Sequence, residues 1–253
     1  MSFTVLTIPC RSDNYAFLIH NESTDETALV DAPESQPIIN EINKRGWKLD
    51  TILITHHHID HVEGIDVLIQ EFNPTIYGNQ DDNSRLPKLD VAIRDGQTFT
   101  ICGQEFQAID VSGHTIGHLA YITKGAAFTA DSLMALGCGR VFEGTFPMMW
   151  TSLSKLAQLP EETIIYSGHE YTLANGRFAI TIEPNNPDLI ARIKREEEKC
   201  SKGIPTVPSS LKEELKTNPF LRANQPEVKR LLNMEDANNV EVFAEIRTRK
   251  DNF

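Results

Sequence analysis

Three consecutive histidines, an aspartate and a fourth histidine are concentrated in residues 55–61, which read THHHIDH. Neutral imidazole nitrogens and carboxylate oxygens are ligands that zinc, iron and manganese accept in proteins. Side chains two residues apart in an extended backbone point to the same side, so we expect His56 and His58 to bind one ion while the histidine between them faces away. Asp60 and His61 follow the turn and suit a second ion. The stretch therefore predicts half of a two-metal site.

The elements around this stretch place it on a turn between a strand and a helix. The apolar, partly β-branched run 51–54 predicts a buried strand, and apolar residues from Val62 to Phe72 recur at helical spacing, which predicts a helix starting near Asp60. A histidine tag or a solvated histidine loop is the plain alternative. An internal position framed by a strand and a helix argues against it.

Three more ligand-type side chains directly follow predicted strands. His114 lies in SGHTIGH, Asp131 in FTADS and His169 in YSGHEY. Folds of the α/β class place their sites on such turns, although each residue alone could cap a turn or pack in the core. A carboxylate has two oxygens and can bridge two cations about 3.5–4 Å apart, which makes Asp131 the expected link.

The number of ligands that each ion needs, and the direction in which each segment points its side chains, divide these residues between two ions. Spacing alone leaves His118 nearly as good a candidate as His114. We expect one ion on His56, His58 and His114, the other on Asp60, His61 and His169, and Asp131 shared.

The predicted secondary structure changes near residue 172, from mainly strands to mainly helices. Before it, short apolar runs and turn residues predict a three-strand meander within residues 1–33, a helix ending at Gly46, and hairpins at Gly103 and at Lys124 with Gly125. After it, helices are expected from the Asn186 cap to Gly203, after a capping box at Ser210, and near 228–232 and 242–246. The sequence thus predicts an α/β domain over 1–172 and a small helical domain over 173–253.

Charge and composition narrow the function classes. A net charge of −12 argues against a nucleic-acid substrate, which needs a concentrated basic surface. No apolar stretch reaches the length of a membrane span, and the first residues lack the pattern of a signal peptide. Four scattered cysteines suggest neither a thiolate metal site nor a disulfide framework. We expect a cytoplasmic monomer with reduced cysteines that binds a small molecule.

The motifs resemble the metallo-β-lactamase superfamily, whose HxHxDH signature is matched at 56–61. Over its full length the chain looks like glyoxalase II, the hydroxyacylglutathione hydrolases; the narrower matches are GCGRVFEG at 137–144, SGHEYT at 167–172, NPFLR at 218–222 and the terminal RTRKDNF. The resemblance implies an αββα sandwich followed by an all-α glutathione-binding domain, and it favours His114 over His118.

The implied reaction is hydrolysis of S-D-lactoylglutathione and related thioesters to glutathione and a 2-hydroxy acid such as D-lactate, a step of methylglyoxal detoxification. A metal-bound hydroxide would attack the carbonyl, because coordination lowers the pKa of water to about 7. Asp60 and Asp131 could assist proton handling beside their role as ligands. Two divalent ions are expected, with zinc favoured and iron or manganese as alternatives.

Residues for the substrate are carried over by position. Arginine and lysine suit the two carboxylates of glutathione, although charged helix ends are often only solvated. Phe142 stands where relatives often have tyrosine, and Asp31 matches an aspartate that orients a metal-bound histidine. The expected substrate-binding residues are Arg140, Phe142, Tyr171, Arg247 and Lys250.

Two other functions fit the same metal motif. One is a different hydrolase of the superfamily, and the other is a metal-binding protein of this fold without turnover. The complete ligand set and the GCG and RxxKDxF motifs favour the thioesterase.

Overall fold

The computed structural model describes residues 3–253, so residues 1 and 2, with which the predicted first domain begins, lie outside it. The chain forms two compact units that interleave along the sequence. Unit 1 comprises Met1–Val111 and Ile116–Ala130, and unit 2 comprises Ser112–Thr115 and Asp131–Phe253. The boundary predicted at 172/173 between an α/β domain and a helical domain rests on the pattern of the sequence and stays a prediction.

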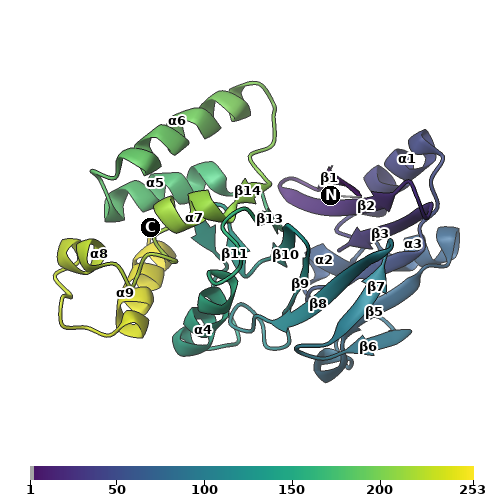
Figure 1. The fold of residues 1–253 in the computed structure, drawn as a ribbon, viewed down its shortest axis with the longest axis horizontal. Coiled ribbons are helices and arrows are strands. Elements are labelled where there is room, and N and C mark those ends of the chain that lie inside the picture. The colour runs from purple at the N-terminus through teal and green to yellow at the C-terminus, as the bar shows by residue number, and fades with distance from the viewer. Residues whose placement is uncertain (1–2) are drawn as a thin grey trace. The chain divides into compact units, whose positions relative to one another are not determined.

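Unit 1 contains a sheet of six strands in the order β1 to β6 (Figure 1). The first three strands are antiparallel, which confirms the predicted meander, and the remaining pairs are parallel. The strands are β1 (Thr4–Cys10), β2 (Asn14–Asn21), β3 (Glu26–Val30), β4 (Thr51–Leu53), β5 (Thr75–Asn79) and β6 (Val91–Ile93).

Helices α1 (Ser35–Arg45) and α3 (Ile65–Phe72) pack against this sheet. Ile38 and Ile42 of α1 and Leu68 of α3 are buried in one apolar cluster with strand residues such as Ile52. Helix α1 ends at Gly46, as predicted, because Gly46 adopts a φ of 69° that glycine accepts without steric cost.

The helix predicted from near Asp60 to Phe72 is two helices, so that part of the prediction is wrong. Helix α2 (Ile59–Val62) begins where expected, but the chain breaks before α3. The backbone N–H of Gly64 donates to the carbonyl of Ala32 at 2.8 Å, and a Cβ at Gly64 would lie 2.8 Å from the backbone nitrogen of Ser35. This close approach of two backbones interrupts the helix.

Unit 1 contributes four strands to a second sheet, as two antiparallel hairpins that were both predicted. Strands β7 (Thr98–Ile101) and β8 (Gln104–Asp110) turn at Gly103, and β9 (Leu119–Thr123) and β10 (Ala126–Ala130) turn at Gly125. Phe17 of the first sheet and Phe128 of the second have ring centroids 5.9 Å apart, and the Tyr121 hydroxyl donates to the carbonyl of Ile54 at 2.7 Å. The two sheets of this unit thus face each other across a common core.

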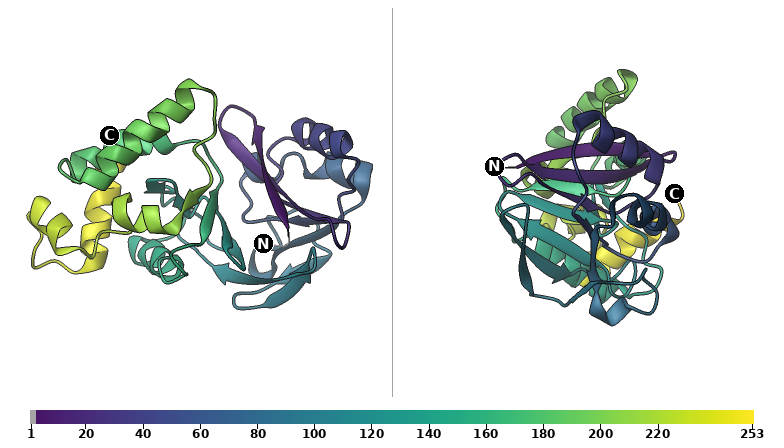
Figure 2. Two further views of the ribbon diagram at one scale, coloured as in Figure 1. Left: turned by 45° about the horizontal axis from the view of Figure 1, so that its top comes forward. Right: turned by 90° about the vertical axis from the view of Figure 1, so that its right-hand side faces the viewer.

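Unit 2 is mainly helical (Figure 2). The short strands are β11 (Leu133–Met134) and β12 (Gly137–Cys138), which form a hairpin, and β13 (Ile164–Ser167) with β14 (Ser209–Ser210). The helices are α4 (Phe146–Leu156), α5 (Thr172–Ile182), α6 (Pro187–Ser201), α7 (Leu211–Thr217), α8 (Pro226–Leu231) and α9 (Asn239–Asp251).

The predicted N-caps at Asn186 and Ser210 are present. Asn186 caps α6 by accepting from the N–H of Leu189, and Ser210 caps α7 by accepting from the N–H of Glu213. Helices α4 and α5 were not predicted, although Thr145, which accepts from the N–H of Met148, is an ordinary N-cap of α4. Within residues 3–253, no helix has the length and apolar character needed to cross a membrane.

Candidate metal centre

Three of the four histidines of THHHIDH, namely His56, His58 and His61, converge in unit 1, directly after β4. His56 is fully buried, and its ring centroid lies 4.7 Å from that of His58 and 4.2 Å from that of His61. The short helix α2 carries Asp60 and His61, and a carboxylate oxygen of Asp60 lies 3.8 Å from Nε2 of His61. Four side chains of the types that bind metals thus gather around one turn.

His57 takes part in a different group of contacts. Its Nδ1 lies 3.3 Å from a carboxylate oxygen of Asp82, and its Nε2 lies 3.3 Å from a guanidinium nitrogen of Arg85. Arg85 also donates to the backbone carbonyl of Ile116 at 2.6 Å. His57 therefore belongs to a polar contact beside the predicted ligands, as the alternation of an extended backbone requires.

Asp31 accepts hydrogen bonds that orient the ligand-type side chains of unit 1. One carboxylate oxygen accepts from the N–H of Thr55 at 2.9 Å, and the other lies 2.8 Å from both the Thr55 hydroxyl and Nδ1 of His61. A carboxylate accepts, so Nδ1 of His61 carries the proton and Nε2 is the nitrogen suited to a metal. Asp31, His56 and His61 offer ligand atoms within 4.8 Å of one another, but these hydrogen bonds favour a supporting role for Asp31.

Two further residues that contact the predicted ligands, Asn14 and Thr55, were not predicted from the sequence. Asn14 donates from its side-chain amide to the carbonyl and to a carboxylate oxygen of Asp60, both at 3.0 Å. The Thr55 hydroxyl lies 3.0 Å from Nδ1 of His56. Thr55 adjoins the motif and could have been suspected, whereas Asn14 is 46 residues from Asp60 and carries no spacing signal.

Unit 2 brings the other three predicted ligands together. One carboxylate oxygen of Asp131 lies 3.5 Å from Nε2 of His114 and 3.2 Å from Nε2 of His169. Nδ1 of His114 lies 2.7 Å from the backbone carbonyl of Arg140, which places the proton on Nδ1. Asp131 therefore lies between two imidazoles whose Nε2 atoms both face it.

The glycine motif at 137–139 has a steric reason beside the ligand-type side chains of unit 2. A Cβ at Gly139 would lie 2.0 Å from the backbone oxygen of Asp131 and 2.9 Å from Nδ1 of His114. A Cβ at Gly137 would lie 2.4 Å from the side-chain amide of Asn175. Any larger residue at Gly139 would displace the segments that carry Asp131 and His114.

His118, the alternative to His114, lies in unit 1 and has other contacts. Its ring stacks on that of His56 with centroids 4.6 Å apart, and its Nδ1 lies 3.2 Å from the carbonyl of Leu119. The distance from His114 to Asp131 favours His114 as the ligand.

The residues predicted to bind substrate differ in exposure. Phe142 and Arg140 are exposed, with the guanidinium 5.8 Å from the ring centroid. Tyr171 stacks on His169 with centroids 4.7 Å apart. Arg140 also reaches Asp251 of α9, with 3.7 Å between its Nε and a carboxylate oxygen.

Arg247 and Lys250 are more enclosed than a solvated helix end would be. Arg247 is buried, donates to the carbonyl of Cys138 at 2.9 Å and pairs with Asp251 at 3.0 Å. The ammonium of Lys250 lies 5.3 Å from the rings of both Phe178 and Phe253. Burial, followed by nearby arginine charges, lowers the pKa of Lys250 below its ordinary value.

Comparison with known proteins covers the whole chain. The family described as "Metallo-beta-lactamase superfamily" matches residues 11–169, and "Hydroxyacylglutathione hydrolase C-terminus" matches residues 170–253. Proteins named hydroxyacylglutathione hydrolase from Roseobacter denitrificans and Ruegeria pomeroyi are 54% and 52% identical over 255 residues, covering 100% of each chain.

A solved structure shares the fold at lower identity. The crystal structure of ETHE1 from Myxococcus xanthus has a TM-score of 0.69 and 24% identity, and the match covers 98% of this chain and 90% of that one. The predicted fold class, a metallo-β-lactamase domain followed by a helical C-terminal region, is confirmed. The chain belongs to the hydroxyacylglutathione hydrolases, the glyoxalase II family of the metallo-β-lactamase superfamily.

Proposed function

We propose that this protein hydrolyses S-D-lactoylglutathione and related S-2-hydroxyacylglutathiones to glutathione and the 2-hydroxy acid, which removes the thioester formed in methylglyoxal detoxification. The observation that carries the proposal is the identity of about half of all positions, from end to end, with relatives named for this activity. The metal-binding residue types in both units add chemical support.

The donor set fits two divalent ions. Imidazole nitrogens and carboxylate oxygens suit zinc, with iron and manganese as alternatives. The Nδ1 contacts of His61 and His114 favour tautomers with Nε2 available for coordination, and Asp131 facing two imidazoles suits a bridging carboxylate. We assign His56, His58 and His114 to one ion, Asp60, His61 and His169 to the other, and Asp131 to both.

Bound ions of this kind would lower the pKa of a coordinated water and polarise the thioester carbonyl, so no side-chain nucleophile is needed. The residues of this chain supply orientation. Asp31 holds His61, the Arg140 carbonyl holds His114, and Asn14 holds Asp60. Asp60 and Asp131, as carboxylates at the centre, would also accept protons during the reaction.

Cationic and aromatic side chains of unit 2 are assigned to the glutathione moiety. Charge-assisted hydrogen bonds from arginine and lysine suit its carboxylates in a protein whose net charge is −12. Exposed Phe142 offers an apolar contact without the hydroxyl of a tyrosine. The proposed binding residues are Arg140, Phe142, Tyr171, Arg247 and Lys250. A cytoplasmic, monomeric enzyme without nucleic-acid or membrane partners remains the prediction.

Metal analysis combined with a thioesterase assay tests the proposal. The wild type should hold two metal ions per chain and hydrolyse S-D-lactoylglutathione. Asp131→Ala should lose the pair of ions and nearly all turnover, whereas His57→Gln, a change within the same motif, should keep both. A wild type that binds metals without cleaving the thioester would favour a non-catalytic protein of this fold, and two tightly held ions in Asp131→Ala would refute the bridging assignment.

A further inference from the structure

The β11/β12 hairpin joins two of the groups that shape the metal centre in unit 2. Leu133 pairs with Cys138, and Met134 pairs with Gly137. Asp131 lies two residues before the hairpin, and Arg140, whose carbonyl contacts His114, lies two residues after it. A shift of this hairpin would therefore move both Asp131 and the group that orients His114.

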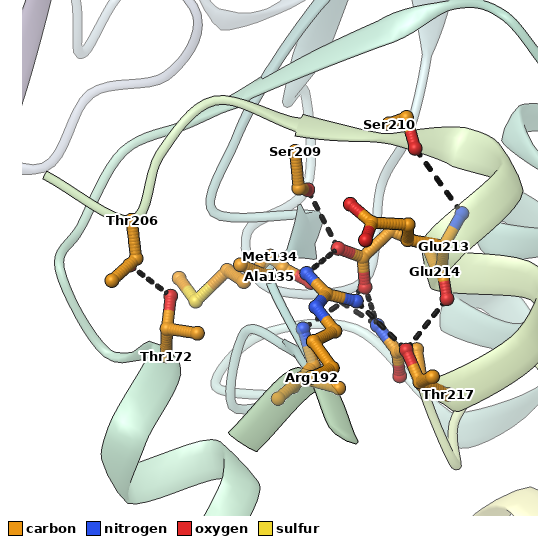
Figure 3. Close-up of polar contacts among 12 residues, drawn as sticks. Met134, Ala135, Thr172, Arg192, Thr206, Ser209, Ser210, Glu213, Glu214 and Thr217 are labelled. Atoms are coloured by element: carbon orange, nitrogen blue, oxygen red, sulfur yellow. Dashed lines mark hydrogen bonds and ion pairs between the residues drawn. The ribbon is translucent and has the colours of Figure 1, made fainter. Parts of the chain in front are cut away.

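Glu214 of α7 holds the turn of this hairpin (Figure 3). Its fully buried carboxylate accepts from the backbone N–H of Leu136 at 2.9 Å, from the Ser209 hydroxyl at 2.6 Å and from the Arg192 guanidinium at 2.5 Å. Leu136 has a φ of 56°, a conformation that residues with a Cβ adopt at a steric cost. The hydrogen bond to Glu214 stabilises the turn in that conformation.

Asn218 reaches the same hairpin, four residues after Glu214. Its buried amide nitrogen lies 3.1 Å from the carbonyl of Met134, 2.9 Å from that of Gly137 and 3.1 Å from a carboxylate oxygen of Glu214. Glu214 in the middle of α7 and Asn218 at its C-cap thus satisfy three backbone groups of the hairpin. Buried backbone groups need such partners, so the contacts constrain where the hairpin lies.

Thr206 forms hydrogen bonds that fix the turn carrying His169, the third predicted ligand of this unit. Its backbone N–H donates to the Glu170 carboxylate at 2.8 Å, and its hydroxyl donates to the other oxygen of the same carboxylate. The hydroxyl also lies 2.6 Å from that of Thr172 (Figure 3). Glu170 directly follows His169, so the contact restricts the backbone of that ligand.

We propose that segment 206–218 is a positioning element for the metal centre, with Glu214 and Asn218 setting Asp131 and His114, and Thr206 setting His169. The inference rests on the proposed function only in that these three side chains are taken as metal ligands. The helical C-terminal region then has a second role beside substrate binding. Residues that support metal ligands in this way typically change metal affinity by about 10–100-fold when they are removed.

Metal retention by the purified full-length protein tests this role. Asn218→Ala removes the contacts to Met134 and Gly137, and Thr206→Val keeps the side-chain shape but removes the hydroxyl. Each variant is loaded with zinc, and the ions that remain are counted against rising concentrations of a chelator. We expect Asn218→Ala to weaken both ions by about tenfold or more, and Thr206→Val to weaken mainly the ion on His169.

A control variant separates positioning from general loss of stability. Elsewhere in unit 2, the two Glu183 oxygens accept hydrogen bonds from Arg222 at 2.8 and 2.9 Å, and Glu183→Gln replaces one of these oxygens by an NH2 group that cannot accept. It should lower the unfolding temperature while zinc retention stays at the wild-type level.

Each outcome decides for or against the proposal. Wild-type zinc retention in both Asn218→Ala and Thr206→Val would overturn it, and so would equal zinc loss in the Glu183→Gln control. If Asn218→Ala does not fold, Thr206→Val decides, because Thr206 lies outside α7. A wild type that holds two ions but leaves S-D-lactoylglutathione intact would refute the proposed function alone, since zinc retention is measured without turnover.

Discussion

Replacing Asp31 by asparagine should remove one metal ion by changing the tautomer of a histidine. Asp31 is buried and accepts at both oxygens, from the N–H of Thr55 at one and from the Thr55 hydroxyl and His61 at the other. An asparagine has the same shape but only one acceptor oxygen. It cannot satisfy Thr55 and His61 at once, and the two possible orientations of its amide have different consequences.

In the first orientation the amide oxygen faces the N–H of Thr55 and the NH2 group faces His61. The amide then donates to Nδ1, so the proton moves to Nε2 and blocks the nitrogen assigned to the metal. In the second orientation the NH2 group faces the N–H of Thr55 at 2.9 Å, which leaves buried donors opposed at a cost of about 1–3 kcal/mol. The first orientation should cost about 10–100-fold in affinity for the ion on His61. That corresponds to about 1.4–2.8 kcal/mol, at about 1.4 kcal/mol for each factor of ten.

Zinc content after dialysis against a graded chelator series measures this effect, with the free energy of unfolding measured on the same samples. We expect Asp31→Asn to fall from two retained ions to one and to lose most of its turnover. Asp50→Asn is the matched control, because the Asp50 carboxylate accepts from the N–H of Thr27 at 2.9 Å, away from the histidines. Two ions held at wild-type affinity, together with an unchanged free energy of unfolding, would refute the reasoning.

Three further predictions follow from the geometry. Gly139→Ala should lower zinc affinity by about tenfold or more, because its Cβ would meet the backbone of Asp131 at 2.0 Å. Gly203→Ala is the control, because Gly203 has a φ of 67° and open space around it. The control should lose only about 1 kcal/mol of stability and should keep its metal. The lowered pKa of Lys250 means that its ammonium loses its proton at a lower pH than usual, so KM for glutathione thioesters should rise on the alkaline side. In Lys250→Arg that rise should be absent, because arginine keeps its charge. Identical profiles of KM against pH in the two proteins would exclude a contact between Lys250 and the substrate. Burial raises the pKa of the thiols of Cys10, Cys102 and Cys138 to about 11 or 12. A thiol reagent near neutral pH should therefore modify at most Cys200 in the folded protein and all four cysteines after denaturation. Several fast-reacting thiols before denaturation would contradict this.

Much of the fold was predictable because its signals are local. The meander of β1 to β3, the hairpins at Gly103 and Gly125 and the caps at Asn186 and Ser210 each depend on residues within a few positions of one another. The break at Gly64 was not predictable, because it depends on the backbone of Ala32, which the periodicity of the 59–72 segment does not report. Helix α4 was missed even though its Thr145 cap is local.

Short segments of the sequence already indicate the chemistry expected of this protein. The residue types in THHHIDH, SGHTIGH, FTADS and SGHEYT define a metal-binding donor set, and their positions after strands are properties of short segments. The acidic net charge argued against a nucleic-acid substrate, the motifs along the chain indicated the family, and the comparisons confirm the family.

The groups that orient those donors become apparent only in the folded chain. Asn14 on Asp60, Asp31 on His61 and the Arg140 carbonyl on His114 are contacts between residues 26 to 46 positions apart. Asn218 and Met134, whose contact supports the hairpin beside Asp131, are 84 positions apart. Such pairs have no periodicity or spacing in the sequence, because packing of whole elements brings them together. The predicted metal ligands can therefore be identified from the sequence, but the groups that orient them are found only in the folded structure.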